Sequence, residues 1–194
     1  MPDAHHPLAG HLTPGRHGAA GPNPVRLSTP RRDIVQIAAR KGQTAALKAA
    51  LKAAFGLELG EAGHATYGGG LTALPIQPDA WVLVSEPRGE GALAAEVKKA
   101  VGVAGSVVDQ THGRCVIALT GERAPEVMAR FCRIDLHPAV FGPGRAAVTP
   151  MAELFCVLSH GPAAHYEMIL FSTFADSFFH SVITAAATTG YEIV

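Results

Sequence analysis

Three side chains that could carry out covalent chemistry lie close together in the sequence: Cys132, Asp135 and His137. A cysteine attacks as its thiolate, which needs an adjacent base or cation, and His137 oriented by Asp135 could supply one. Sequence neighbours rarely reach that geometry, so the pattern favours a structural Cys132 and an Asp135 that caps backbone amides. A redox or repair function for Cys132 is the weakest hypothesis for this chain.

The cysteines argue against two kinds of site by their number and spacing. Cys115, Cys132 and Cys156 are an odd number and contain no C-x-x-C pair. A disulfide framework and a thiolate zinc site both require a different pattern. We expect three buried free thiols.

Histidines could bind a metal at two places. Four of them lie within the first thirty residues, where no regular backbone would orient them: His5, His6, His11 and His17. His160 and His165 are separated by Gly161 and Pro162, which breaks the i, i+4 spacing of metal ligands on a helix. We expect these two at strand edges or in a loop, and no functional metal at either place.

Charge and hydropathy narrow the classes of partner. The formal net charge is zero and only 16% of the 194 residues are charged, so no basic field could hold a nucleic acid or an anionic membrane. No apolar run approaches the roughly 20 residues that cross a bilayer, and the N-terminus lacks a hydrophobic signal region. We expect a cytoplasmic protein that binds neither nucleic acid nor membrane.

The second half of the chain has the composition of a protein interface. Of the 8 phenylalanines, 7 follow residue 102, and this half has 5 arginines and no lysine. Arginine and aromatic side chains are enriched at interfaces because they gain contact at a small ordering cost. The candidate contact residues are Arg133, Phe141, Arg145, Phe178 and Phe179. The alternative is that the phenylalanines fill the core and the arginines are solvated.

Apolar spacing predicts an α+β fold that positions these side chains. Residues 1–30 are rich in proline and glycine without apolar periodicity, which predicts a flexible tail. The chain then becomes regular, and Leu47, Leu51 and Phe55 form one stripe of a helix. The expected order is a strand, a helix, two strands and a helix, over residues 34–39, 44–55, 72–76, 81–85 and about 93–101.

The second half repeats this order of elements. It is expected to contain a strand, a helix, three strands and a helix, over residues 115–119, 122–131, 146–150, 154–159, 166–171 and 174–187. We therefore expect a single domain over residues 31–194, built from two similar β-α-β-β-α halves of about 31–102 and 103–194.

Two sequence segments resemble a known family. Residues 108–128, V-D-Q-T-H-G-R-C-V-I-A-L-T-G-E-R-A-P-E-V-M, resemble the aminomethyl-folate family typified by the glycine cleavage T protein. Residues 131–151, F-C-R-I-D-L-H-P-A-V-F-G-P-G-R-A-A-V-T-P-M, are similar to the sarcosine oxidase gamma subunit through their C-x-x-D-L-H-P core. The resemblance implies a folate-binding, aminomethyltransferase-like fold.

The resemblance also implies a function for the chain as one part of an assembly. It would be a non-catalytic structural subunit of a heterotetrameric, flavin-dependent sarcosine oxidase, beside larger alpha and beta subunits and a small delta subunit. These partners would carry FAD, FMN, NAD, zinc and tetrahydrofolate, with none bound by this chain. The complex would oxidise sarcosine or a similar N-methyl amine to glycine, peroxide and a one-carbon unit passed to tetrahydrofolate.

The same scaffold leaves an alternative function, a stand-alone protein that binds folate or a one-carbon adduct. Members of the T-protein family carry a Gly-rich, acidic stretch after the T-P-M segment. The corresponding stretch here is A-E-L-F-C-V-L-S-H-G, with Glu153 as its one carboxylate. This departure argues against an autonomous aminomethyltransferase.

Overall fold

The computed structural model describes residues 6–194, which form two compact units. Unit 1 combines the described residues up to Pro30 with His112–Val194, and unit 2 consists of Arg31–Thr111. The first described residues of the chain therefore belong to unit 1, the next segment forms all of unit 2, and the last segment forms the rest of unit 1. The expected boundary between residues 102 and 103 was wrong, because the strand that follows it pairs with the first strand of unit 2.

Unit 2 is an antiparallel sheet with two helices. Its elements in chain order are β3 (Asp33–Ala39), α1 (Thr44–Phe55), β4 (Thr66–Gly68), β5 (Leu71–Gln77), β6 (Ala80–Ser85), α2 (Ala92–Val101), the 3₁₀ turn η1 (Gly102–Ala104) and β7 (Gly105–Asp109). The strands lie in the order β4-β5-β6-β3-β7. The five elements expected from the sequence were confirmed to within one residue at each end.

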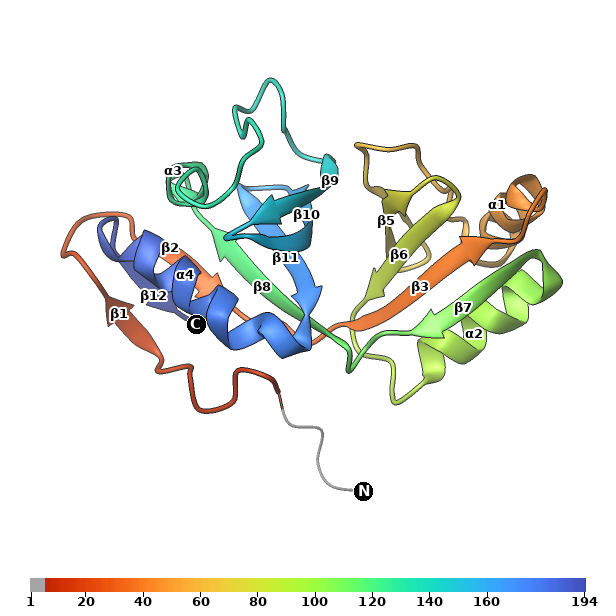
Figure 1. Ribbon diagram of the computed structural model, residues 1–194, viewed down its shortest axis with the longest axis horizontal. Coiled ribbons are helices and arrows are strands. Elements are labelled where there is room, and N and C mark those ends of the chain that lie inside the picture. Colours follow the sequence, from red (N-terminus) through yellow and green to blue (C-terminus); the bar gives the residue numbers. More distant parts are fainter. Residues whose placement is uncertain (1–5) are drawn as a thin grey trace. The chain divides into compact units, whose positions relative to one another are not determined.

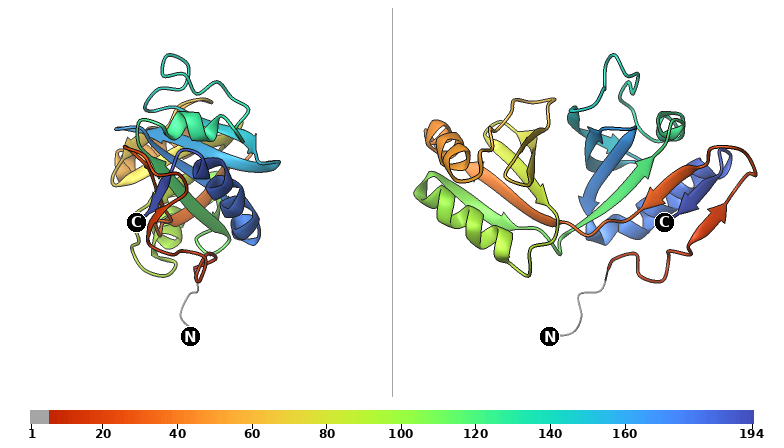
Figure 2. Two further views of the ribbon diagram at one scale, coloured as in Figure 1. Left: turned by 90° about the vertical axis from the view of Figure 1, so that its left-hand side faces the viewer. Right: turned by 180° about the vertical axis from the view of Figure 1, so that it is seen from behind.

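Both helices of unit 2 cover one face of its sheet (Figures 1 and 2). The apolar stripes of the helices are buried there, with Leu51 of α1 and Val97 of α2 fully inaccessible. Ile37 and Leu83 belong to the same cluster on the sheet side. Trp81 is anchored at its polar end, since Nε1–H donates to the Gly60 carbonyl at 2.9 Å. The four-residue spacing of apolar side chains therefore sets the face that each helix buries.

Unit 1 is a larger mixed sheet with two helices. Its elements are β1 (Gly15–His17), β2 (Val25–Ser28), β8 (Arg114–Thr120), α3 (Ala124–Met128), β9 (Ala146–Met151), β10 (Leu154–Gly161), β11 (His165–Phe171), η2 (Ser172–Phe174), α4 (Ala175–Ala187) and β12 (Tyr191–Ile193). The strand order is β1-β12-β2-β8-β11-β10-β9. Among the strand pairs of unit 1 within residues 6–194, β12 and β2 are parallel and the others are antiparallel.

One face of the unit 1 sheet is covered by α3 and α4. Alternate residues of a strand share a face, and Ile117, Leu158 and Met168 all point to the helix-covered face. They are buried in one cluster with Val127 of α3 and Val182 of α4. The helix expected over residues 122–131 is shorter than predicted, because the chain turns after α3 and leads Cys132 into a bridge with Met151.

The two units share the order β-α-β-β-β-α-β, from β3 to β7 and from β8 to β12. Their strand orders also correspond, since β4-β5-β6-β3-β7 matches β9-β10-β11-β8-β12 once β2 is set aside. In unit 2, β4 between the helices and β7 after α2 were not expected. In unit 1 the three strands expected between the helices were confirmed as β9, β10 and β11, and β12 after α4 was not expected. The inserted β2 is the main difference between the two sheets.

The prediction that residues 1–30 form a flexible tail was wrong for residues 6–30; residues 1–5 lie outside the described part. β1 and β2 flank β12 on its two sides, as Figure 1 shows in red and orange beside blue. β2 also pairs with β8. Leu8, Val25 and Leu27 are fully buried in the unit 1 core. The first strands are therefore a structural part of unit 1.

The connection between β1 and β2 fits closely against the end of α4. The Ala19 amide donates to the Ala187 carbonyl at 2.7 Å. A Cβ added to Gly18, whose φ is +75°, would lie 2.5 Å from the same oxygen, so this position requires glycine. The prolines and glycines that suggested flexibility belong to turns around short strands, whose pairing partners lie too far along the chain for a local pattern to reveal.

Replacing Leu27 with alanine is expected to lower the free energy of unfolding by about 2–5 kcal/mol, because it leaves a cavity in the unit 1 core. Arg26→Ala in the same strand is the control. The Arg26 side chain is 62% exposed and its ion pair with Glu192 is long, at 3.8 Å, so its loss should cost less than about 1 kcal/mol. Chemical unfolding of the full chain, followed by circular dichroism, measures both. Equally small changes would contradict the burial of β2.

Candidate functional site

The predicted contact residues Arg133, Phe141 and Arg145 lie in the loop between α3 and β9, and His160 ties this loop to β10. The His160 ring donates from Nδ1 to the Phe141 carbonyl at 2.7 Å; the proton must be on Nδ1 because a carbonyl oxygen only accepts. The His160 amide donates to the Arg145 carbonyl at 2.9 Å, and the Gly144 amide donates to the His160 carbonyl at 2.8 Å. Three hydrogen bonds thus hold the end of the loop.

His160 is buried in a stack of rings. It is 4% exposed, and its ring centroid lies 4.1 Å from that of Tyr166 and 6.3 Å from that of Phe141, with both rings nearly parallel to it. Burial also raises the pKa of Tyr166. The expectation that His160 and His165 lie at strand ends was confirmed, but the burial of His160 was not foreseen. Its role in this structure is to hold the loop.

The three candidate phenylalanines are core residues. Phe141, Phe178 and Phe179 are 6%, 0% and 3% exposed and belong to the unit 1 cluster. Phe178 also packs edge-on against Phe131, with ring centroids 6.0 Å apart. The prediction that these three rings form an exposed contact surface was wrong, because α4 turns Phe178 and Phe179 toward the sheet and His160 holds Phe141 inward. The alternative of a phenylalanine-filled core holds for these positions.

The two candidate arginines remain at the surface. Arg133 forms an ion pair of 2.5 Å with Glu153, and the two side chains are 69% and 81% exposed. Arg145 donates from Nε to the Val140 carbonyl at 3.3 Å. An exposed ion pair contributes little to stability. Contact of Arg133 and Arg145 with a partner stays a prediction.

Cys132 lacks the surroundings of a nucleophile. Burial raises the pKa of its thiol, and hydrogen bonds from the Ile134 and Arg133 amides offset this only in part. The Asp135 carboxylate accepts the His137 amide at 2.9 Å, which is the loop-capping role expected for it. His137 Nδ1 in turn accepts the Ala139 amide at 3.3 Å. These contacts shape the loop and do not activate the thiol.

The cysteines and the N-terminal histidines are the remaining candidates from the sequence. Cys115, Cys132 and Cys156 are buried and free, as expected. His11 lies 3.1 Å from Asp176, and His17 is 2.8 Å from the Thr13 carbonyl; His5 is outside the described residues. Within residues 6–194 there is no group of three or more His, Cys, Asp or Glu side chains that could hold a metal. No helix in that part of the chain is long and apolar enough to cross a membrane.

A different set of rings is exposed on unit 1. Phe155, Phe171 and Phe174 are 70%, 46% and 46% exposed. Val157 of β10 pairs with Ile169 of β11; Phe155 precedes Val157 by two residues and Phe171 follows Ile169 by two. Phe155 and Phe171 therefore lie at the same end of neighbouring strands, on the face opposite the helices. We call Phe155, Phe171, Phe174 and Arg114 the aromatic surface.

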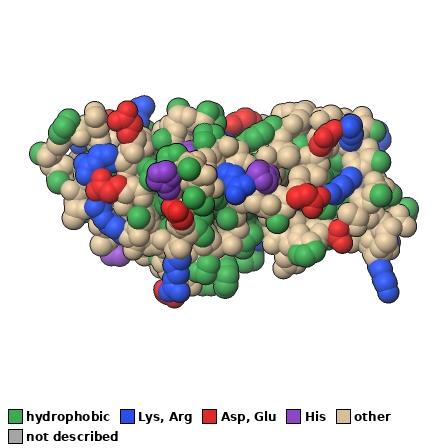
Figure 3. Space-filling view, turned by 90° about the horizontal axis from the view of Figure 1, so that it is seen from above, with side chains coloured by type: hydrophobic (Ala, Val, Ile, Leu, Met, Phe, Trp, Pro, Cys, Tyr) green, Lys and Arg blue, Asp and Glu red, His purple; other side chains and the backbone are tan. Residues whose placement is uncertain are grey.

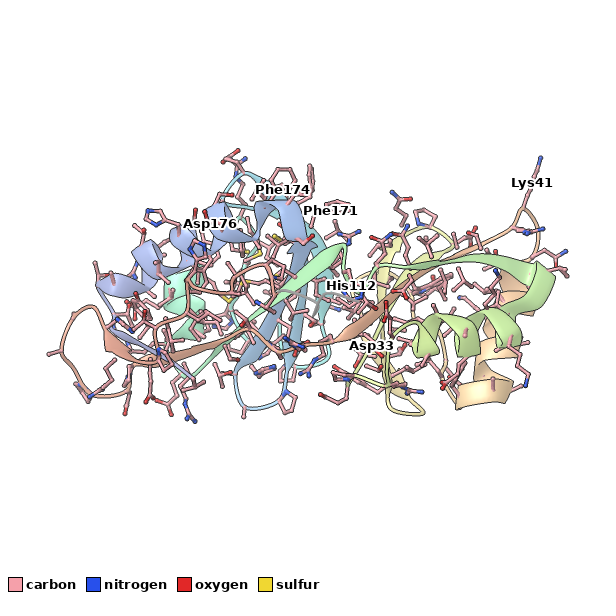
Figure 4. All side chains as sticks on the ribbon, turned by 90° about the horizontal axis from the view of Figure 1, so that it is seen from below. Asp33, Lys41, His112, Phe171, Phe174 and Asp176 are labelled. Atoms are coloured by element: carbon pink, nitrogen blue, oxygen red, sulfur yellow. The ribbon has the colours of Figure 1, made fainter. Side chains whose placement is uncertain are left out.

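Figure 4 shows that Phe171 and Phe174 lie near one another at the start of α4. Arg114 completes the group, since it is the strand partner of Phe171 and its guanidinium carbon lies 3.8 Å from the centre of that ring. Composition alone did not separate these exposed rings from the buried ones. The signal that could have found Phe155 is strand alternation, because Cys156 and Leu158 face the core and their neighbours must face away.

A family model described as "Sarcosine oxidase, gamma subunit family" matches residues 40–188. The chain belongs to this family. A gamma subunit from Arthrobacter sp. is 38% identical over 111 residues, which are 57% of this chain and 53% of that subunit. A gamma subunit from Corynebacterium sp. (strain P-1) is 31% identical over 60% of this chain and 57% of its own length. The matched region thus spans about half the length of these relatives.

Solved structures extend the similarity to nearly the whole chain. A chain of the heterotetrameric sarcosine oxidase from Corynebacterium sp. U-96, in complex with pyrrole 2-carboxylate, has a TM-score of 0.80 and 26% identity. The match covers 95% of this chain and 96% of that one. The glycine cleavage aminomethyltransferase T from Bartonella henselae has a TM-score of 0.63 at 16% identity, over 88% of this chain and 47% of that one. The latter shows a shared fold alone, which is α+β with two sheets.

The buried thiols should react slowly with a thiol reagent at pH 8. Burial raises the pKa of Cys115 to about 11 and of Cys156 to about 12, so less than about a hundredth of each thiol is ionised at that pH. Labelling of Cys115 and Cys156 in the folded chain should rise only above pH 10. The same chain in denaturant is the control and should expose three fast thiols. One fast equivalent in the folded chain at pH 8 would show an activated cysteine and contradict this assignment.

Proposed function

We propose that this chain is a non-catalytic structural subunit of a heterotetrameric, flavin-dependent sarcosine oxidase. The observation that carries the proposal is its match to a chain of the Corynebacterium sp. U-96 enzyme, which covers 95% of this chain and 96% of the other at a TM-score of 0.80. A near-complete match in both directions favours the same place in the same kind of assembly. Family membership supports it independently.

The chemistry of the described residues supports a role without catalysis. Cys132 is a buried thiol of raised pKa, and Asp135 is used by the loop backbone. His160 is buried in a ring stack and donates to a carbonyl. Cys132, Asp135 and His160 therefore take part in the structure of unit 1 and show no activated nucleophile or base. Glu153, the one carboxylate of its stretch, is paired with Arg133 at the surface.

In this proposal the reaction takes place on the partner chains. Larger alpha and beta subunits and a small delta subunit would hold FAD, FMN, NAD, zinc and tetrahydrofolate in the cytoplasm. They would convert sarcosine or a similar N-methyl amine to glycine, peroxide and a one-carbon unit. This chain would stabilise the assembled state, because a subunit that binds only folded partners shifts their equilibrium toward folding.

The alternative function is a stand-alone protein that binds folate or a one-carbon adduct. The fold shared with aminomethyltransferase T supports it. The Arg133–Glu153 pair weighs against it, because a carboxylate 81% exposed in an ion pair is not set in a dry, shaped pocket for a pterin ring. The oxidase proposal is therefore preferred.

Affinity purification of the tagged chain from its native cell tests the proposal. The expected product is a yellow complex that contains larger chains, shows a flavin spectrum and releases peroxide when sarcosine is added. Deletion of this chain should lower the yield of the complex more than the activity of each assembled molecule. A colourless chain recovered alone would contradict the proposal. Heat released on mixing that chain with tetrahydrofolate would then establish the alternative.

A further inference from the structure

The aromatic surface of unit 1 contains an arginine, Arg114, whose charge is not balanced by an acidic side chain among the described residues. Nε of Arg114 is buried and has no hydrogen-bond partner among the described residues. Burial lowers the pKa of this guanidinium, and the one described group that raises it is the Cys156 thiol. A partly buried guanidinium without an acidic neighbour is destabilised by the loss of water, and a carboxylate placed beside the guanidinium offsets that penalty.

Other arginines of the chain are paired with acidic side chains. Arg88 lies 2.9 Å from Glu96, Arg123 lies 2.9 Å from Glu126, and Arg130 lies 3.0 Å from the same glutamate. On the face seen in Figure 3, acidic and basic side chains are interspersed in the same way. Arg114 differs from these arginines because its guanidinium stacks on Phe171 and forms no ion pair with a carboxylate within residues 6–194.

The rings around Arg114 have the character of an interface centre. Phe155 and Phe171 project from the face opposite the helices, and Phe174 follows in η2. Large exposed rings next to an arginine are the composition of the energetically dominant part of protein interfaces. An arginine stacked on a ring also keeps its planar fork free to bind a carboxylate in a bidentate manner.

We propose that a larger subunit of the complex docks on this aromatic surface and places an aspartate or glutamate carboxylate against Arg114, with apolar side chains over Phe155 and Phe171. This inference rests on the proposed function and adds to it the docking surface and the chemistry of the partner segment. The partner is a protein segment that carries one acidic side chain within an apolar stretch. The carboxylate pairs with the positively charged guanidinium of Arg114, and the apolar residues remove the rings from water.

The test co-expresses each tagged variant of the full chain with the wild-type chain and the other subunits. The ratio of the two chains in the purified complex measures the affinity of the variant relative to the wild type. Phe155→Ser is expected to weaken binding by about 10-fold or more and Arg114→Met by about 30-fold. Arg114→Lys keeps the charge but loses the planar fork, so it should fall between Arg114→Met and the wild type. The controls are Val103→Ser, 82% exposed in unit 2, and Arg26→Met on the unit 1 sheet, both expected within about twofold of wild type.

Hydrogen exchange provides a second readout that needs no variant. Binding of the wild-type chain should slow amide exchange at residues 154–157 and 168–174. Protection at other residues alone would contradict the assignment of the docking surface.

The outcomes of the affinity test separate this inference from the proposed function. Unchanged affinity of Phe155→Ser and Arg114→Met, with firm binding of the wild type, would contradict the docking surface but leave the proposed function intact. Failure of the wild-type chain to bind would overturn the proposed function itself. The oligomeric state of the isolated chain is the last control. If the wild-type chain is a dimer and Phe155→Ser is a monomer, the surface mediates self-association, and the proposal of a larger subunit as its partner is wrong.

Discussion

The pairing of β2 with both β8 and β12 is the constraint on which unit 1 depends. β2 runs antiparallel to β8 and parallel to β12, so a strand from the start of the chain joins two strands that follow unit 2. Its buried Val25 and Leu27 belong to the same cluster as the inner face of α4. In unit 2 the corresponding strands β3 and β7 pair directly. In unit 2 the first and last strands of the shared order therefore pair with each other, whereas in unit 1 the N-terminal strand β2 lies between them.

This arrangement separates the side chains that build the fold from those available for binding. Phe178 and Phe179 are on the inner face of α4, whereas Phe171 and Phe174, just before that helix, are at the surface. The loop that carries Phe141 and Arg145 is fixed by hydrogen bonds to His160. Unit 1 therefore exposes the aromatic surface and several ion pairs, which supports the proposed role in assembly.

Local patterns in the sequence were sufficient where neighbours in the chain also pack together. The spacing of Leu47 and Leu51 predicted α1 and its buried face, and alternating apolar runs predicted β10 and β11. They failed for β2, because its partners lie about 90 and 165 residues further along the chain. They also failed for the candidate site, because phenylalanine content does not tell which face of α4 a ring occupies. The stacking of Arg114 on Phe171, without an acidic neighbour among the described residues, depends on tertiary contacts and cannot be predicted from the sequence.

Amide hydrogen exchange of the isolated chain tests most directly whether the first strands complete unit 1. The prediction is that the amides of β2 which bond to neighbouring strands exchange as slowly as those in the middle of β8, since both open only when the sheet opens. Rapid exchange throughout β2, with β8 still protected, would show that the unit 1 sheet is stable without its N-terminal strand and would contradict the structure described above.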